Sequence, residues 1–221
     1  MIKNIVFDMD GVLLDTERVY NRAWARTAEQ LIAPSDMEKL KRVMVECVGR
    51  NEADTRACFD ENFGADFPYD EFVNITRGHF KEIEENEGLP VMKGVIECLT
   101  YLNEEGYNVA LATSTRQQTA ERQLKEAGLY KYFSKFVYGN YVEHSKPEPD
   151  IYLLAAKELN AEPSDCYAVE DSYNGIKSAY AAGMKPVMIP DQLPPTEEIR
   201  KLLFLESDSL LSFMETLKSI K

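Results

Sequence analysis

The pattern of apolar and polar positions changes twice along the chain. Residues 5–7 form a short apolar run, typical of a buried strand. From about residue 15 to residue 86, apolar residues recur at spacings of three and four, which predicts helices. Beyond residue 88, short apolar runs alternate with helical patterns. The chain therefore predicts one strand, then an all-helical block, then a long segment of alternating strands and helices.

Glycine, proline and capping residues mark the ends of these elements. In the helical block, we expect helices over residues 18–31, 37–48, 52–62 and 69–86. In the second segment, we expect helices over 93–105, 117–127, 149–159 and 173–182, a short one after Pro195 and one from Ser209 onwards. The strands are expected over 5–7, 107–113, 136–138, 166–169, 186–189 and 202–205.

Alternating strands and helices predict an α/β fold, a parallel sheet with helices on both faces. The opening strand belongs to this sheet, so the helical block is an insertion after it. The expected division is residues 1–15 with 88–221 as the α/β core and 16–87 as a separate helical domain. Two linkers, Val12–Thr16 and Glu87–Val91, join them, an arrangement suited to opening and closing over a site.

Acidic residues follow the first predicted strand. Asp8 and Asp10 are two positions apart, so they lie on one side if the strand geometry continues to its end. Gly11 then permits a sharp turn or a close approach to a ligand. Ligands of open α/β sheets bind at such carboxyl ends. Taken alone, the pair is more typical of a polar turn after a buried strand than of a ligand site.

Other strand ends carry polar residues as well. Thr113 and Ser114 precede a helix, where a hydroxyl and free N–H groups bind anions or simply cap the helix. Glu170 and Asp171 follow a buried strand, a place that packing alone does not explain. Lys146 lies in a proline-rich loop and, taken alone, reads as a surface lysine.

Together these residues are suited to one type of reaction. The four carboxylates offer hard oxygens for Mg²⁺, while Thr113 and Lys146 offer a hydroxyl and a cation to phosphoryl oxygens. A carboxylate nucleophile that attacks phosphorus forms an aspartyl-phosphate. A second carboxylate protonates the leaving oxygen and later activates water. The combination predicts phosphoryl transfer.

The amino-acid composition limits the kinds of binding partner that we expect. The net charge is −13, which argues against nucleic acid or an anionic membrane surface as the main partner. The four cysteines are far apart and only two histidines are present, so a zinc site is not expected. We expect a cytoplasmic monomer with reduced cysteines, without a signal peptide or a membrane span.

The motifs DMDGVLLDTE, LATSTR, SKPEPDIY and VEDSYNGIKSAYAAGM resemble those of the haloacid dehalogenase-like (HAD) hydrolase superfamily. The resemblance covers nearly the whole chain and is closest to the β-phosphoglucomutase and sugar-phosphatase group. It implies a Rossmann-like parallel sheet with an inserted all-helical cap. By this resemblance, Asp8 would be the nucleophile and Asp10 the general acid and base. Lys146 would hold the nucleophile and the phosphoryl group in position.

The resemblance also implies the binding residues. Thr113 and the Ser114 backbone would hold the phosphate. Mg²⁺ would be bound by Asp8, Asp171 and the Asp10 backbone carbonyl, with Glu170 acting directly or through water. Asn174 and Gly175 match a family loop and would have a supporting role only.

The helical block departs from the mutase pattern. The chain has Tyr20 where the mutase has a substrate-contacting His, and Glu52 where it has a substrate Arg. Arg50 and Arg77 could replace that Arg, and Trp24 matches the mutase but suits a helix core equally well. These departures favour a Mg²⁺-dependent phosphatase acting on a small phosphomonoester, such as a sugar phosphate. A β-phosphoglucomutase-type mutase is the alternative.

Three other functional hypotheses agree less well with the sequence. A haloacid dehalogenase needs neither Mg²⁺ nor the second acid, Asp10. A receiver domain carries its phosphorylated Asp on a later strand and has no helical insertion. A non-catalytic binding protein leaves the acids and Lys146 without a purpose.

Overall fold

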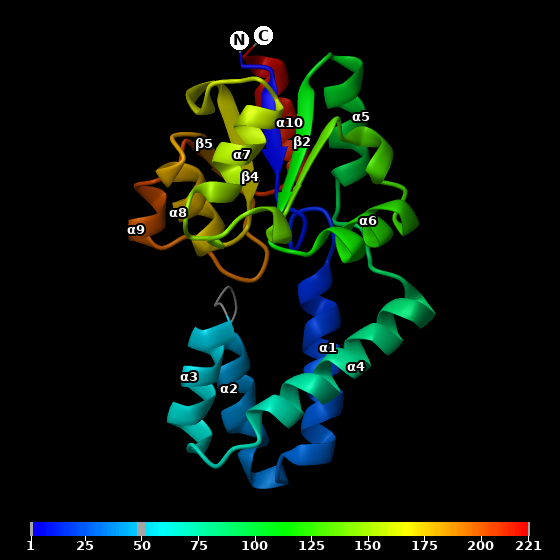
Figure 1. Cartoon of the computed structure of the whole chain (residues 1–221), viewed down its shortest axis with the longest axis vertical. Coiled ribbons are helices and arrows are strands. Elements are labelled where there is room, and N and C mark those ends of the chain that lie inside the picture. The colour runs from blue at the N-terminus through cyan, green and yellow to red at the C-terminus, as the bar shows by residue number, and fades with distance from the viewer. Residues whose placement is uncertain (1, 48–51, 221) are drawn as a thin grey trace. The chain divides into compact units, whose positions relative to one another are not determined.

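The computed structural model describes residues 2–47 and 52–220. The chain divides into two compact units (Figure 1). One is Met1–Asp15 together with Pro90–Lys221, and the other is Thr16–Leu89. The first is the α/β unit and the second is the helical unit. Residues 88 and 89 group with the helical unit rather than with the α/β segment to which the sequence pattern assigned them.

The α/β unit is built on a parallel sheet with β1 (Asn4–Phe7) near its middle. The strand order is β3-β2-β1-β4-β5-β6, and each of the five pairings between these strands is parallel. The other strands are β2 (Asn108–Thr113), β3 (Lys135–Tyr138), β4 (Cys166–Glu170), β5 (Lys185–Met188) and β6 (Leu205–Glu206). This sheet confirms the predicted Rossmann-like class.

One predicted strand is misplaced. Only Leu205 and Glu206 pair with β5, whereas a strand was expected over 202–205. The backbone N–H groups of Leu202 and Leu203 instead donate to the carbonyls of Ile199 and Arg200, which extends the turn after α9 (Glu197–Arg200). An apolar run this short fits a helical turn as well as a strand.

Helices lie on both faces of the sheet. Figure 1 shows α7 in front of the sheet and α10 behind it. The helices of this unit besides α9 are α5 (Val95–Glu104), α6 (Gln117–Glu126), α7 (Asp150–Glu158), α8 (Tyr173–Ala181) and α10 (Leu210–Ser219).

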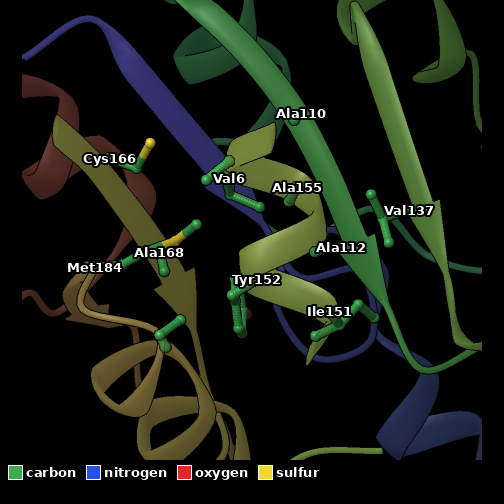
Figure 2. Close-up of a cluster of buried hydrophobic side chains, with 13 residues drawn as sticks. Val6, Ala110, Ala112, Val137, Ile151, Tyr152, Ala155, Cys166, Ala168 and Met184 are labelled. Carbon is green, nitrogen blue, oxygen red and sulfur yellow. The ribbon is translucent and has the colours of Figure 1, made fainter. Parts of the chain in front are cut away.

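Side chains alternate between these two faces along each strand. Val6 of β1 and Ala168 of β4 join a buried apolar cluster with α7 and α8 (Figure 2). Tyr167, one position earlier, points the other way and meets the Phe213 ring of α10 at a centroid distance of 6.2 Å. Residues two positions after Val6 and Ala168 therefore point towards α7 and α8.

The two segments that join the units run side by side. The Asp15 N–H donates to the Pro90 carbonyl at 2.8 Å, and the Met92 N–H donates to the Leu13 carbonyl at 2.9 Å. Leu14 and Val91 form an isolated antiparallel bridge between them. The α/β unit therefore holds both ends of the helical insertion together.

The helical unit has an aromatic core. Phe59 is fully buried, and its ring meets those of five other residues: Trp24, Phe63, Phe67, Tyr69 and Phe72. The helices are α1 (Thr16–Leu31), α2 (Met37–Cys47), α3 (Glu52–Phe63) and α4 (Tyr69–Glu87), with a 3-10 turn, Pro34–Asp36, leading into α2.

Among the described residues, no helix combines the length and the apolar character needed to cross a bilayer. All four cysteines are buried and free. They act as small core residues, as the sequence predicts.

Phe59→Ala is expected to destabilise the helical unit by about 3–5 kcal/mol, because it leaves a cavity among the other rings. The single tryptophan, Trp24, lies 5.5 Å from Phe59 between ring centroids, so its fluorescence in a urea titration reports on this unit. Phe204→Ala is the control, since that ring is 54% exposed and belongs to the α/β unit. An unchanged Trp24 transition in Phe59→Ala would contradict this description of the core.

Candidate active site

Asp8 stands at the carboxyl end of the central strand. Its N–H donates to the Val169 carbonyl at 3.0 Å, so the ladder between β1 and β4 continues one residue beyond Phe7. The alternation that points Val6 towards α7 also points Asp8 that way. The Asp8 side chain is therefore buried beside the loop that precedes α7.

Lys146 of that loop reaches Asp8. Its ammonium lies 2.6 Å from Asp8 Oδ1, 2.7 Å from Glu170 Oε1 and 3.2 Å from the Ala112 carbonyl oxygen. An ammonium has three N–H donors, so each donor has an acceptor. The side chain is only 7% exposed, which shows that Lys146 is part of the interior rather than of the surface.

Glu170, the last residue of β4, is completely buried. Its Oε1 accepts hydrogen bonds from Lys146 and from the Tyr152 hydroxyl at 2.6 Å. Its Oε2 accepts from the Ser172 hydroxyl at 3.1 Å. A Cβ on Gly175 would lie 1.9 Å from this carboxyl group, so a glycine is required there. Both oxygens of Glu170 thus accept hydrogen bonds. The donors lie on α7, in the loop before α7 and directly before α8.

Burial and charge shift the pKa values of this pair. Burial raises the pKa of the Asp8 carboxyl to about 7, against the lowering effect of Lys146. Burial also lowers the pKa of the Lys146 ammonium, but Asp8 and Glu170 together raise it further, to a value above its ordinary one. Lys146 is therefore a permanent cation, while Asp8 is a carboxylate that gains from additional positive charge.

The second acid, Asp10, is held by two threonines at the end of β2 and just beyond it. Thr115 donates its hydroxyl to Asp10 Oδ2 at 2.9 Å, and the Thr113 hydroxyl lies 3.4 Å from the same oxygen. The Thr115 N–H donates to Thr113 Oγ1 at 3.0 Å, which fixes the two hydroxyls relative to each other. The Asp10 carboxyl group is therefore oriented by β2 as well as by its own turn.

Asp8, Glu170 and Asp171 form a cluster in which one carboxylate oxygen from each residue lies within 4.8 Å of those of the other two. Asp171 approaches the chain closely, since a Cβ on Gly11 would lie 2.1 Å from its Oδ2. Gly11 also has φ = +78°, which favours glycine. Hard oxygens this close together repel one another and fit a divalent cation.

The structure brings together most of the residues predicted for the site. Asp8, Lys146, Glu170 and Asp171 lie within one cluster, and Asp10 contacts Thr113. The remaining predicted residue of this edge, Ser114, is exposed and follows β2 directly.

The candidates in the helical unit have local contacts of their own. Tyr20 packs on Phe80 with ring centroids 4.2 Å apart, and Trp24 lies in the aromatic core. Arg77 is exposed on α4, and Arg50 lies outside the described residues. The roles suggested for them in substrate binding stay predictions.

Sequence reasoning missed three contributors, Thr115, Tyr152 and Ser172, which donate to the acids. Gly175, expected to have a supporting role only, makes room for one of these acids. Thr115 and Tyr152 stand inside the motifs LATSTR and SKPEPDIY, and Ser172 directly follows the acidic pair. A usable signal for Tyr152 is that a buried tyrosine hydroxyl needs a hydrogen-bond partner. Its partner, 18 residues away, becomes visible only in the fold.

Residues 2–183 match the haloacid dehalogenase-like hydrolase family. The chain belongs to this family. It is 34% identical over 183 residues to the phosphorylated carbohydrates phosphatase of Thermotoga maritima, covering 83% of this chain and 82% of that one. It is 30% identical over 200 residues to the β-phosphoglucomutase of Bacillus subtilis, covering 87% of this chain and 85% of that one.

A solved structure agrees with these matches. The crystal structure of CbbY from Rhodobacter sphaeroides in complex with phosphate is 26% identical, with a TM-score of 0.72, and the match covers 95% of each chain. The predicted resemblance, fold class and enzyme class are confirmed: the protein is a HAD-like hydrolase with phosphatases among its relatives.

Gly175→Ala and Gly78→Ala are expected to change stability in opposite directions, although both replace a helical glycine. The Gly175 variant should lose about 1–3 kcal/mol, because its Cβ displaces the Glu170 carboxyl group. The Gly78 variant should gain up to about 1 kcal/mol, because nothing lies within 4 Å of its Cβ. Thermal unfolding followed by circular dichroism measures both. Equal stability of Gly175→Ala and the unsubstituted protein would refute the close contact.

Proposed function

We propose that the protein is a Mg²⁺-dependent phosphatase that hydrolyses a small phosphomonoester through an aspartyl-phosphate on Asp8. The observation that carries the proposal is the Lys146 ammonium, 2.6 Å from Asp8 Oδ1 and within a cluster of three acids. This arrangement supports a nucleophilic role for Asp8, beside a fixed cation and candidate metal ligands at the carboxyl end of the central strand.

In the first step, a carboxylate oxygen of Asp8 attacks phosphorus and the bond from phosphorus to the alcohol oxygen breaks. The leaving oxygen takes a proton from Asp10, so the alcohol departs neutral. Lys146 offsets negative charge on the phosphoryl oxygens and keeps Asp8 oriented. The products are the alcohol and the Asp8 acyl phosphate.

In the second step, water attacks phosphorus and Asp10 accepts its proton. The bond between phosphorus and Asp8 breaks, which releases inorganic phosphate and restores the Asp8 carboxylate. Asp10 therefore returns to its protonated form, ready for another cycle. The Thr115 hydroxyl, 2.9 Å from Asp10 Oδ2, keeps the orientation of Asp10 for both transfers.

The acidic cluster fits Mg²⁺. Asp8, Asp171 and the Asp10 backbone carbonyl would hold the ion, with Glu170 adding its charge directly or through water. When bound, the ion supplies positive charge that favours ionised Asp8 and neutralises phosphoryl oxygens. Glu170 already accepts hydrogen bonds from three side chains, which supports a largely electrostatic contribution from it.

We place the transferred phosphate at the end of β2. The Thr113 hydroxyl and the Ser114 backbone N–H would hold its oxygens, since both stand where β2 gives way to α6. Phosphate in the related CbbY structure supports an anion site in this fold.

A phosphorylated carbohydrate is the proposed substrate class, on the strength of the Thermotoga maritima relative. The α/β unit would be the catalytic core and the helical unit a cap that selects the substrate. The net charge of −13 disfavours nucleic acid as a competing partner.

A mutase is the second candidate, because the chain resembles β-phosphoglucomutase over 87% of its length. Two departures weigh against it. Tyr20 stands in place of a histidine and packs on Phe80, and Glu52 stands in place of an arginine. Hydrolysis therefore remains the better proposal.

Purified protein with Mg²⁺ is expected to release inorganic phosphate from one or more members of a sugar-phosphate panel. Asp8→Asn should reduce this to background, and Asp10→Asn should reduce it by about 10²–10⁴-fold. Chelation should abolish activity, and Mg²⁺ should restore it. Asp165→Asn is the matched control, because that carboxylate is exposed and outside the cluster. Full activity in Asp8→Asn would refute the covalent mechanism.

The mutase alternative predicts a different product. With β-glucose 1-phosphate and the bisphosphate primer, we expect inorganic phosphate and no accumulation of glucose 6-phosphate. Coupled detection of glucose 6-phosphate measures this directly. Isomerisation faster than phosphate release would replace the phosphatase proposal with the mutase.

A further inference from the structure

Tyr152 is a polar residue within an apolar cluster. It lies on α7 and is completely buried among neighbours that include Val6, Ala155 and Ala168 (Figure 2). A phenylalanine would fill the same space without burying a hydroxyl group. The hydroxyl donates to Glu170 Oε1 at 2.6 Å, so it serves the acidic cluster rather than the packing.

Tyr152 also touches the cation. The Lys146 Nζ lies 5.0 Å from the centroid of the Tyr152 ring, within the range of a cation–π contact. Lys146 and the Tyr152 hydroxyl share one acceptor, Glu170 Oε1. Tyr152 therefore acts on Lys146 in two ways, through its ring and through the shared carboxylate oxygen.

Glu170 has little freedom to turn. Its Oε2 accepts from Ser172, and Gly175 approaches the carboxyl group so closely that no Cβ fits. Its Oε1 is held by Tyr152 from α7 and by Lys146. Without the Tyr152 hydroxyl, Lys146 would be the remaining donor to Oε1 in the part of the chain that the structure describes.

We propose that Tyr152 is a positioning residue that keeps the Lys146 ammonium on Asp8 by holding and partly neutralising Glu170. The inference rests on the phosphatase function proposed above. When the hydroxyl is removed, Glu170 Oε1 becomes a stronger acceptor for Lys146. The ammonium then moves towards Glu170 and away from Asp8, where it is needed during phosphoryl transfer.

Tyr152→Phe tests this, because the ring and its packing remain while the hydroxyl is lost. We expect kcat to fall about tenfold, the effect of one hydrogen bond to a charged group, with the substrate KM within about twofold of the unsubstituted value. Tyr138→Phe is the matched control, since Tyr138 is a buried tyrosine that donates to another glutamate, Glu121. An unchanged kcat in Tyr152→Phe, or an equal fall in Tyr138→Phe, would overturn the proposal.

A double-substitution cycle tests the route through Glu170. Glu170→Gln should lower kcat by itself. Tyr152→Phe should cost little more in that background, because the two changes interrupt one chain of contacts. A further tenfold loss in the double variant would show that Tyr152 acts independently of Glu170 and would overturn the proposed route.

A spectroscopic readout is independent of turnover and of metal. In metal-free protein with ¹⁵N-labelled lysine, the Lys146 ammonium should give a slowly exchanging resonance, because it is buried and all three donors are used. That resonance should shift or broaden in Tyr152→Phe and stay in place in Tyr138→Phe. An unshifted resonance in Tyr152→Phe would overturn the positioning role even if no phosphatase substrate is found. Inactive protein with the expected shift would instead refute only the phosphatase function.

Discussion

One buried cation, Lys146, sets the arrangement of the carboxyl edge of the sheet. Its ammonium lies between Asp8 and Glu170, each within 2.7 Å, and almost no water reaches it. Removing one partner of such a buried pair is expected to cost roughly 3–5 kcal/mol, because the remaining charge is left uncompensated. The end of β1, the end of β4 and the loop before α7 are therefore fixed together by electrostatics as well as by packing.

Sheet register brings these charges to one place. Phe7 of β1 pairs with Val169 of β4, so the next residues, Asp8 and Glu170, are neighbours on adjacent strands. Both point towards α7 because side chains alternate along a strand. The chain order of the strands also reverses at β1, with β2 on one side and β4 on the other. Open α/β sheets bind their ligands at such a point.

Much of this edge could be predicted from sequence, since an acid directly after a buried apolar run is a local signal. Asp8 and Glu170 were found in that way. The burial of Lys146 could not be, because its partners are 138 and 24 residues away along the chain. Tyr152 was missed for the same reason, since its partner Glu170 is 18 residues away. Leu202 and Leu203 were wrongly predicted to lie in a strand. Their apolar run is too short to show a period, so it fits either a strand or a turn.

The hydrophobic core and the proposed reaction centre are consequently one structure. α7 carries Tyr152 on the same face as Ile151 and Ala155, so the helix that closes the core also holds an acid. α8 presents Gly175 to that acid, and the Glu170 carboxyl group fills the space that a larger side chain would need. The Glu170 carboxyl group is tolerated inside because three side chains donate hydrogen bonds to it. Any change in how these helices pack on the sheet therefore alters the position of Lys146, and with it the charge beside Asp8.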